Sequence, residues 1–151
     1  MRQFRKGRRL IALCEQKVQE VQRSLMRLRA ERTRLNEQIR QCENELRSLA
    51  QALTGLQIND ASVTRADIYK QRKQQAIFLH QRLQVDLERN LHIENLAEIE
   101  MDIELLQKQL IVLKRKEMKF IKWTKDGRQQ WQMKQDSAAD DESQEMFPWL
   151  L

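Results

Sequence analysis

The sequence predicts an all-α protein in which two long helices form an antiparallel coiled-coil hairpin, followed by a flexible acidic C-terminal tail. The 151-residue chain contains only 3 Gly and 1 Pro, so it offers few places to turn and favours uninterrupted helices. Charged residues make up 33% of the chain, against about 25% in ordinary globular domains. Its apolar residues recur with the ~3.5-residue period of a coiled coil. This composition disfavours a compact multilayer core.

The strongest periodic signal lies between residues 4 and 56. Two rows of positions, each with a spacing of seven residues, are apolar throughout except at Gly7 and Arg32. The rows are Phe4, Ile11, Val18, Leu25, Arg32, Ile39, Leu46 and Leu53, and Gly7, Cys14, Val21, Leu28, Leu35, Cys42, Leu49 and Leu56. Such a repeat specifies a long helix with one narrow apolar seam. The first helix is therefore expected at about residues 2–53.

A turn is expected at residues 54–64, where the repeat stops. Gly55 and the Asn59–Asp60 pair are turn formers. Thr64 precedes Asp67 by three residues, a variant of the capping box, which makes Thr64 the candidate N-cap of a second helix. That helix is expected at about residues 65–135.

The second helix carries an apolar seam of its own. It consists of Leu96, Ile99, Ile103, Leu106, Leu110, Leu113 and Phe120. Upstream, Tyr69, Ala76 and Leu83 form a row in a different phase, so a phase change is expected between residues 87 and 96, where the pairing stays unassigned. Beyond Leu113 the seam is expected to decay through Glu117, Thr124 and Gly127.

The register follows from the position of the turn. A turn centred near residue 60 gives partners whose numbers add to about 120, which places Ile11 opposite Leu110. Arg32, the charged residue of the first seam, would then lie near Asp86 or Glu88. Two alternatives stay open for Arg32: its head extends out of the seam to water, or it forms an ion pair that sets the register.

The charge is unevenly distributed between a basic domain and an acidic tail. The net charge is +6, and residues 136–151 contribute −5 because they contain five acidic residues and no Lys or Arg. Residues 1–135, the expected hairpin domain, therefore carry +11. A basic surface of this kind suits nucleic acid, an anionic membrane or an acidic protein.

No catalytic, metal or cofactor site is expected. Gly7, Gly55 and Gly127 are isolated, whereas a phosphate-binding loop needs clustered glycines. His80 and His92 lack ligand spacing on a helix and have no cysteine nearby in the sequence. Cys14 and Cys42 would lie roughly 42 Å apart on one helix, so we expect two reduced thiols and no disulfide. No segment resembles a signal peptide or approaches the ~20 apolar residues of a membrane span.

Two surfaces are candidates for binding. Phe78, in the apolar run of residues 76–79, is expected to point away from the first helix, with local packing around Leu56, Ile58 and Val63 as the alternative. The second surface is the end where residues 2–9 and 114–128 meet, each with a charge of +5 and with Trp123 and Trp131 close by. Its alternative is a solvated basic end that binds nothing specific.

The chain resembles the central stalk proteins of bacterial type III secretion systems, the SctO group that includes YscO and InvI, and is more distantly similar to flagellar FliJ. The matching residues are the run from Thr64 to Tyr69, then Lys73 and Gln75 to Ile77, and the stretch from Phe120 to Trp131 with Trp123 and Gly127. The acidic tail matches as well. The sequence departs from some relatives at Gln71–Arg72, where apolar residues can occur.

The resemblance implies a non-enzymatic stalk in the bacterial cytoplasm, at the base of the secretion apparatus. Its implied partners are the hexameric secretion ATPase, the nonameric ring of the export gate and secretion chaperones, without cofactor, nucleic acid or membrane insertion. The expected gate-binding residues are Arg65, Ile68, Tyr69, Gln75 and Phe78, and the expected ATPase-binding residues are Arg5, Arg8, Arg9, Lys116, Lys119, Trp123 and Trp131. Rival functions are a generic coiled-coil adaptor or secretion chaperone, and a basic nucleic-acid-binding rod.

Overall fold

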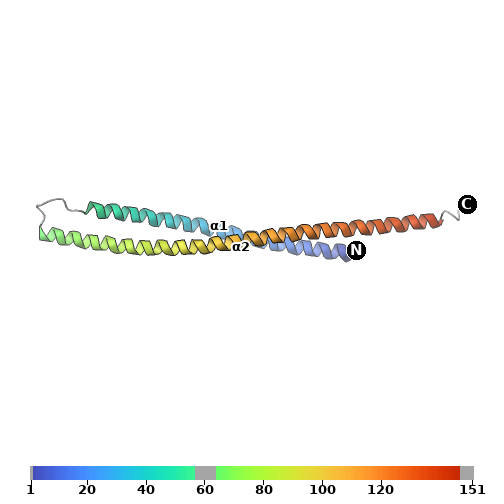
Figure 1. The fold of residues 1–151 in the computed structure, drawn as a ribbon, viewed down its shortest axis with the longest axis horizontal. Helices are drawn as coiled ribbons and strands as arrows, with labels where there is room; N and C mark the ends of the chain where they lie inside the picture. Colours follow the sequence, from blue (N-terminus) through green and yellow to red (C-terminus); the bar gives the residue numbers. More distant parts are fainter. Residues whose placement is uncertain (1, 57–63, 147–151) are drawn as a thin grey trace. The chain divides into compact units, whose positions relative to one another are not determined.

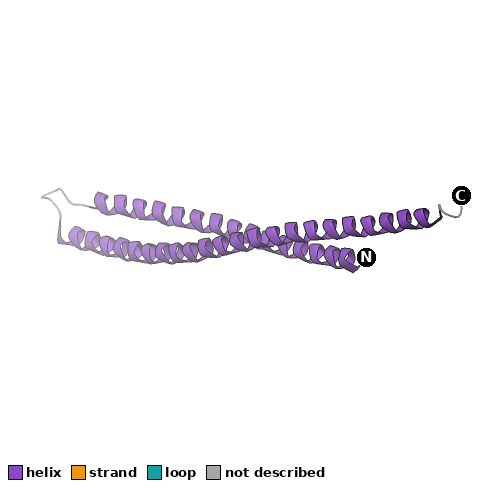
Figure 2. Cartoon of the chain, turned by 45° about the vertical axis from the view of Figure 1, so that its right-hand side comes forward, coloured by secondary structure: helices purple, strands orange, loops and turns teal. Residues whose placement is uncertain are grey.

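The computed structural model describes residues 2–56 and 64–146; the burial of side chains is described for residues 2–56 and 64–139. Two helices account for nearly all of these residues: α1 spans Arg2–Gly55 and α2 spans Arg65–Met146 (Figures 1 and 2). The described residues contain no strand. The all-α class and the two long helices predicted from the sequence are therefore confirmed.

The start of α2 shows the predicted cap. The backbone N–H of Asp67 donates to the Thr64 hydroxyl over 3.4 Å, and that hydroxyl donates to the Asp67 carboxylate over 2.8 Å. The Thr64 carbonyl also accepts bonds from the backbone N–H groups of Asp67 and Ile68. Thr64 thus satisfies donors that a helix N-terminus would otherwise leave unpaired, which fixes the helix start at Arg65.

The chain divides into two compact units, each built from both helices. Unit 1 contains residues 2–25 and 105–146, and unit 2 contains residues 26–56 and 64–104. In each unit the α1 segment runs beside the α2 segment in the opposite direction (Figure 1). The antiparallel pairing predicted from the sequence is thus present in both units.

The α1 seam is confirmed in full. Every residue of its two heptad rows is buried or half-buried, including Gly7 and Arg32. Cys14, Val18, Leu25, Leu35 and Cys42 are the most deeply buried apolar residues of the helix. Because one face of each helix supplies the core, no large side chain among the described residues is completely buried.

The α2 seam differs from the prediction because it keeps one phase throughout. Its half-buried and buried positions form two unbroken heptad rows, Gln71, Phe78, Val85, His92, Ile99, Leu106, Leu113, Phe120 and Gly127, and Arg89, Leu96, Ile103, Leu110, Glu117 and Thr124. The expected phase change between residues 87 and 96 is therefore wrong. Tyr69, Ala76 and Leu83 are exposed, so the apolar row they form faces away from the seam.

The register also differs from the prediction. In unit 1 Gly7 lies against Thr124, and in unit 2 Glu43 pairs with Arg89 over 3.7 Å. These residue numbers add to 131 and 132, rather than to about 120. The α2 seam begins at Gln71, whose side chain donates to the Leu56 carbonyl, and residues 65–70 at the start of α2 are all exposed.

The shifted register moves the expected partners of Arg32. Glu88 lies at Cys42, about ten residues further along α1, so an Arg32 ion pair with Asp86 or Glu88 is not formed. Arg32 is half-buried. Arg89, a charged residue of the α2 seam, forms an inter-helix ion pair with Glu43 instead.

The α2 seam does not decay at Thr124 and Gly127, as the sequence suggested. Thr124 is buried and its hydroxyl donates to the Phe120 carbonyl over 2.7 Å, so its polar group is satisfied within the helix. A Cβ placed on Gly7 would lie 1.9 Å from the Thr124 hydroxyl oxygen and 2.9 Å from the Thr124 Cβ. The absence of a side chain at Gly7 therefore permits the two helices to approach closely.

The acidic segment that the sequence assigned to a tail from residue 136 is helical as far as Met146. The sequence contains no Gly or Pro between Arg128 and Phe147, so nothing there forces the helix to end. The helix therefore continues beyond residue 135, where the sequence analysis placed its end. Residues 147–151 lie outside the described residues.

We predict that Gly7→Ala destabilises the protein by about 1–3 kcal/mol, because the added methyl group overlaps the Thr124 Cβ and forces the helices apart. Gly55→Ala is the matched control, since its Cβ would meet nothing within 4 Å and should stabilise the helix by up to about 1 kcal/mol. Urea unfolding followed by circular dichroism measures both. Thr124→Gly should restore stability to the Gly7→Ala variant, and equal stabilisation by both alanines would contradict the close approach.

Candidate interaction surfaces

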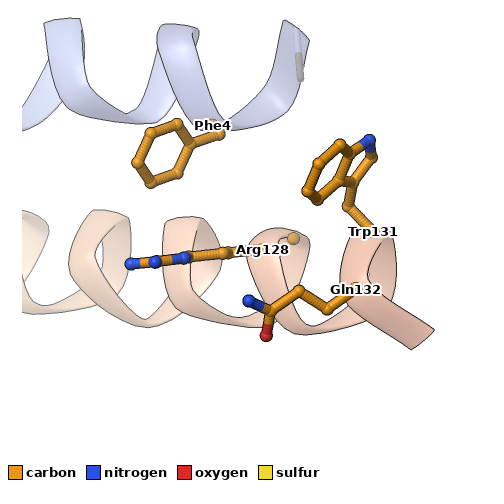
Figure 3. A pocket seen from close by; sticks show the side chains of 5 residues that line it. Phe4, Arg128, Trp131 and Gln132 are labelled. Carbon is orange, nitrogen blue, oxygen red and sulfur yellow. The ribbon is translucent and has the colours of Figure 1, made fainter. Parts of the chain in front are cut away.

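The end of unit 1 that contains the start of α1 presents a pocket of about 250 Å³. Phe4 from α1 and Gly127, Arg128, Trp131 and Gln132 from α2 line it. Figure 3 shows the Phe4 ring extending toward α2 and the Trp131 indole extending toward α1, with the Arg128 side chain lying beneath Phe4. The pocket therefore has two aromatic walls and a cationic floor.

Two arginines lie over the Phe4 ring. The guanidinium carbon of Arg8 is 5.7 Å from the ring centroid and that of Arg128 is 5.8 Å away. Both distances fall within the range of a cation–π attraction. The Phe4 ring thus holds two positive groups close to the pocket. The aromatic walls suit an apolar side chain, and the guanidinium groups suit a neighbouring carboxylate.

Gln3 of α1 contacts α2 beside the pocket. The Gln3 side chain donates to the Trp123 carbonyl over 3.4 Å and lies against Gly127. A Cβ at residue 127 would lie 2.6 Å from the Gln3 amide nitrogen, which is the end of a flexible side chain and can move aside.

All seven residues expected to bind the ATPase lie in unit 1 and are exposed: Arg5, Arg8, Arg9, Lys116, Lys119, Trp123 and Trp131. The register places them differently from the expectation, because Thr124 rather than a residue near 113 faces Gly7. Arg8 therefore lies nearer to Trp123 than to Lys116. The sequence analysis assigned Phe4 to the apolar seam and treated Arg128 only as part of the basic stretch 114–128. It did not identify Gln132, because heptad periodicity does not show which residues line a pocket.

The residues expected to bind the export gate lie at the start of α2 in unit 2. Arg65, Ile68, Tyr69 and Gln75 are exposed, and Tyr69 is the most exposed of the large apolar residues in the described chain at 72%. Phe78 is half-buried on the seam row, so the expectation that it points away from α1 is wrong. The expected phase change produced that error. Of the alternative packing partners, Ile58 and Val63 lie outside the described residues.

One group of side chains in unit 2 could hold a metal ion. Ligand atoms of Cys42, Glu88 and His92 lie within 4.8 Å of one another, and the Nδ1 atom of His92 is buried without a hydrogen-bond partner. Sequence reasoning missed the group because Cys42 is on α1 and the other two are on α2. Burial raises the pKa of the Cys42 thiol, and the nearby Glu88 and Glu45 carboxylates raise it further. The site therefore favours a neutral thiol, whereas a metal needs the thiolate.

Neither helix contains, in the described residues, a segment apolar and long enough to cross a membrane.

We predict that Phe78→Ala lowers the free energy of unfolding by about 1–3 kcal/mol, because a half-buried aromatic is removed from the seam. Tyr69→Ala removes an exposed aromatic nine residues earlier and should change stability by less than about 0.5 kcal/mol. Chemical denaturation of the two variants gives the comparison. A neutral Phe78→Ala would show that the ring lies outside the seam after all.

We predict that the stabilising effect of Cys42 weakens as pH rises above about 9. Because its pKa is raised in the folded state, the unfolded chain loses the thiol proton first, and stability then falls with increasing pH. The difference in unfolding free energy between the native chain and Cys42→Ala should therefore shrink between about pH 8 and 10.5. Cys14→Ala serves as the control thiol variant, and a Cys42 difference that is constant over this range would refute the prediction.

The chain was compared with known proteins in three ways. The family model described as the Salmonella surface presentation of antigen gene type M protein matches residues 5–147. No curated protein and no solved structure matches. The match covers nearly the whole chain, including both helices and the acidic segment at the end of α2. The chain belongs to the family of the Salmonella surface presentation of antigen M protein, a family of type III secretion stalk proteins.

Proposed function

We propose that this protein is the central stalk of a bacterial type III export apparatus and couples the hexameric secretion ATPase to the nonameric export gate. It would act in the cytoplasm at the base of the apparatus, without catalysing a reaction itself. The observation that carries the proposal is the basic, aromatic end of unit 1 with its open Phe4–Trp131 pocket. Membership of a type III secretion family supports it.

At this end of unit 1, we expect the positive charge to speed association with a partner and the pocket to provide specificity. The exposed Arg5, Arg8 and Arg9 on α1 lie in the same unit as the basic residues 114–128 of α2. Such a concentration of positive charge accelerates association with an acidic opening and is screened by salt. The Phe4–Trp131 pocket adds specificity, because partly exposed aromatic residues beside arginine are typical anchors of protein interfaces.

The gate would contact the start of α2 through Arg65, Ile68, Tyr69 and Gln75, all of which are exposed. Phe78 would support this surface from beneath rather than touch the gate. Secretion chaperones are a further proposed class of partner. A nucleic-acid-binding rod is the weaker hypothesis, because residues 86–104 of α2 contain seven acidic residues and a single arginine, which would repel a phosphate backbone.

The test reverses three charges at the basic end, with Arg5→Glu, Arg8→Glu and Arg9→Glu in one variant. We expect the variant to lose at least about tenfold in apparent affinity for the ATPase, because steering and the cationic contacts are both removed. Stimulation of ATP hydrolysis by the purified ATPase measures this, with gate binding measured in parallel and expected to persist.

A control variant with Lys17→Glu, Arg23→Glu and Arg47→Glu changes the net charge equally at exposed positions away from the pocket. It should stimulate the ATPase almost normally at physiological salt. If the first variant also stimulates normally, the basic end is a solvated terminus and the orientation of the stalk must be reversed. Trp131→Ala removes a wall of the pocket without changing the charge, so its effect on ATPase stimulation separates the contribution of the pocket from that of charge.

A further inference from the structure

The side of α2 that faces away from α1 in unit 2 carries apolar residues at six of the ten positions of two heptad rows. Two heptad rows make up this outer α2 face: Tyr69, Ala76, Leu83, Asn90 and Ala97, and Lys73, His80, Leu87, Glu94 and Met101, all of them exposed. Leu83, Leu87 and Met101 are 57%, 62% and 66% exposed. The rows alternate by three and four residues, which is the spacing of a coiled-coil seam, and nothing among the described residues covers them.

We propose that a second copy of this chain binds the outer α2 face, with the two α2 helices antiparallel and related by a two-fold axis near residue 85. In this arrangement each copy presents the same residues, so the contact closes as a dimer. Leu83 of each copy meets Leu87 of the other, and Tyr69 meets Met101. The layers between them pair Ala76 with Glu94, His80 with Asn90 and Lys73 with Ala97. Residues 69–101 correspond to roughly 50 Å of helix at ~1.5 Å per residue, which is long enough for a specific two-helix contact.

The residues that flank the outer α2 face match in the same register. In an antiparallel coiled coil, equivalent flanking positions of the two helices face each other. Ile77 then meets Leu91 of the second copy, and Leu79 meets Ile93; all four are exposed apolar residues. The flanks thus extend the apolar contact on both sides of the axis.

Charge selects the antiparallel direction. Lys70 and Arg72 lie at one end of the outer α2 face, and Glu98 and Glu100 lie at the other. The antiparallel register pairs Lys70 with Glu98 and Arg72 with Glu100 of the second copy, at both ends of the dimer. A parallel dimer would place like charges together, which opposes association. Asp86 of one copy faces Asp86 of the other beside the axis, which is a like-charged contact within this register.

The proposed dimer goes beyond the stalk function. It covers Tyr69, one of the residues proposed to contact the export gate, so dimer and gate would compete for the start of α2. Its test is independent of the stalk proposal, because it uses the purified chain alone.

The experiment is sedimentation equilibrium on the full chain over about 1 to 200 µM. We expect a concentration-dependent dimer. Arg72→Glu and Glu100→Arg should each weaken self-association at least about tenfold, because each creates two like-charged contacts. An equimolar mixture of the two variants should regain a dimer, since the two reversed side chains then pair with each other at one end and the native Arg72 and Glu100 pair at the other. Circular dichroism checks that both variants keep their helicity.

Two further variants sharpen the result. Arg47→Glu reverses an exposed charge on α1 and should leave self-association unchanged. Asp86→Asn removes the like-charged contact at the axis and should strengthen the dimer. A chain that stays monomeric at every concentration overturns the proposal and leaves the outer α2 face to a different protein. A dimer that Arg72→Glu does not weaken, or a mixture that does not regain the dimer, also overturns it.

Discussion

The narrow seam between α1 and α2 determines which face of each helix remains available to partners. A helix has room for one partner on about a third of its circumference, so two paired helices leave most of their surface in contact with water. Burial is accordingly confined to the heptad rows, and the most buried apolar residues, such as Leu25, Leu35 and Ile103, all lie on them. Every other apolar side chain in the described segments is exposed or forms the rim of the seam.

Several residues of this seam are not large and apolar, and these residues do most to fix the register between the two helices. Leucine and isoleucine pack against one another in several registers with little difference in free energy, whereas the close approach of Thr124 requires a residue without a side chain, which Gly7 supplies. The ion pair between Arg89 and Glu43 and the buried Thr124 add further constraints. Such groups contribute little net stability, but a slipped register would leave them clashing or unpaired.

The exposed surfaces differ in chemistry, and the difference is consistent with separate partners. The end of unit 1 combines arginine and lysine with Phe4 and Trp131, which suits an acidic protein surface. The outer α2 face in unit 2 is instead an apolar row with a basic end and an acidic end. A protein of a type III secretion family that links components of an assembly would need surfaces of this kind rather than a catalytic centre.

The sequence by itself determined the two long helices, the α1 seam and the start of α2. Those features depend on interactions between neighbours along the chain: the seven-residue repeat from Phe4 to Leu56 and the Thr64–Asp67 cap. The family was also recognisable from short stretches around Thr64 and between Phe120 and Trp131, which the family match confirms.

The tertiary structure alone decided the register and everything that follows from it. The phase of α2 between residues 71 and 92 could not be read from hydrophobicity, because the outer α2 face carries Leu83 and Leu87 there, whereas the seam includes the polar Gln71, Arg89 and His92. The cluster of Cys42, Glu88 and His92 and the pocket of Phe4 and Trp131 each join residues far apart in the chain. Only the pairing of two helices brings them together, because a one-dimensional pattern records the face of a helix but not the level at which another helix meets it.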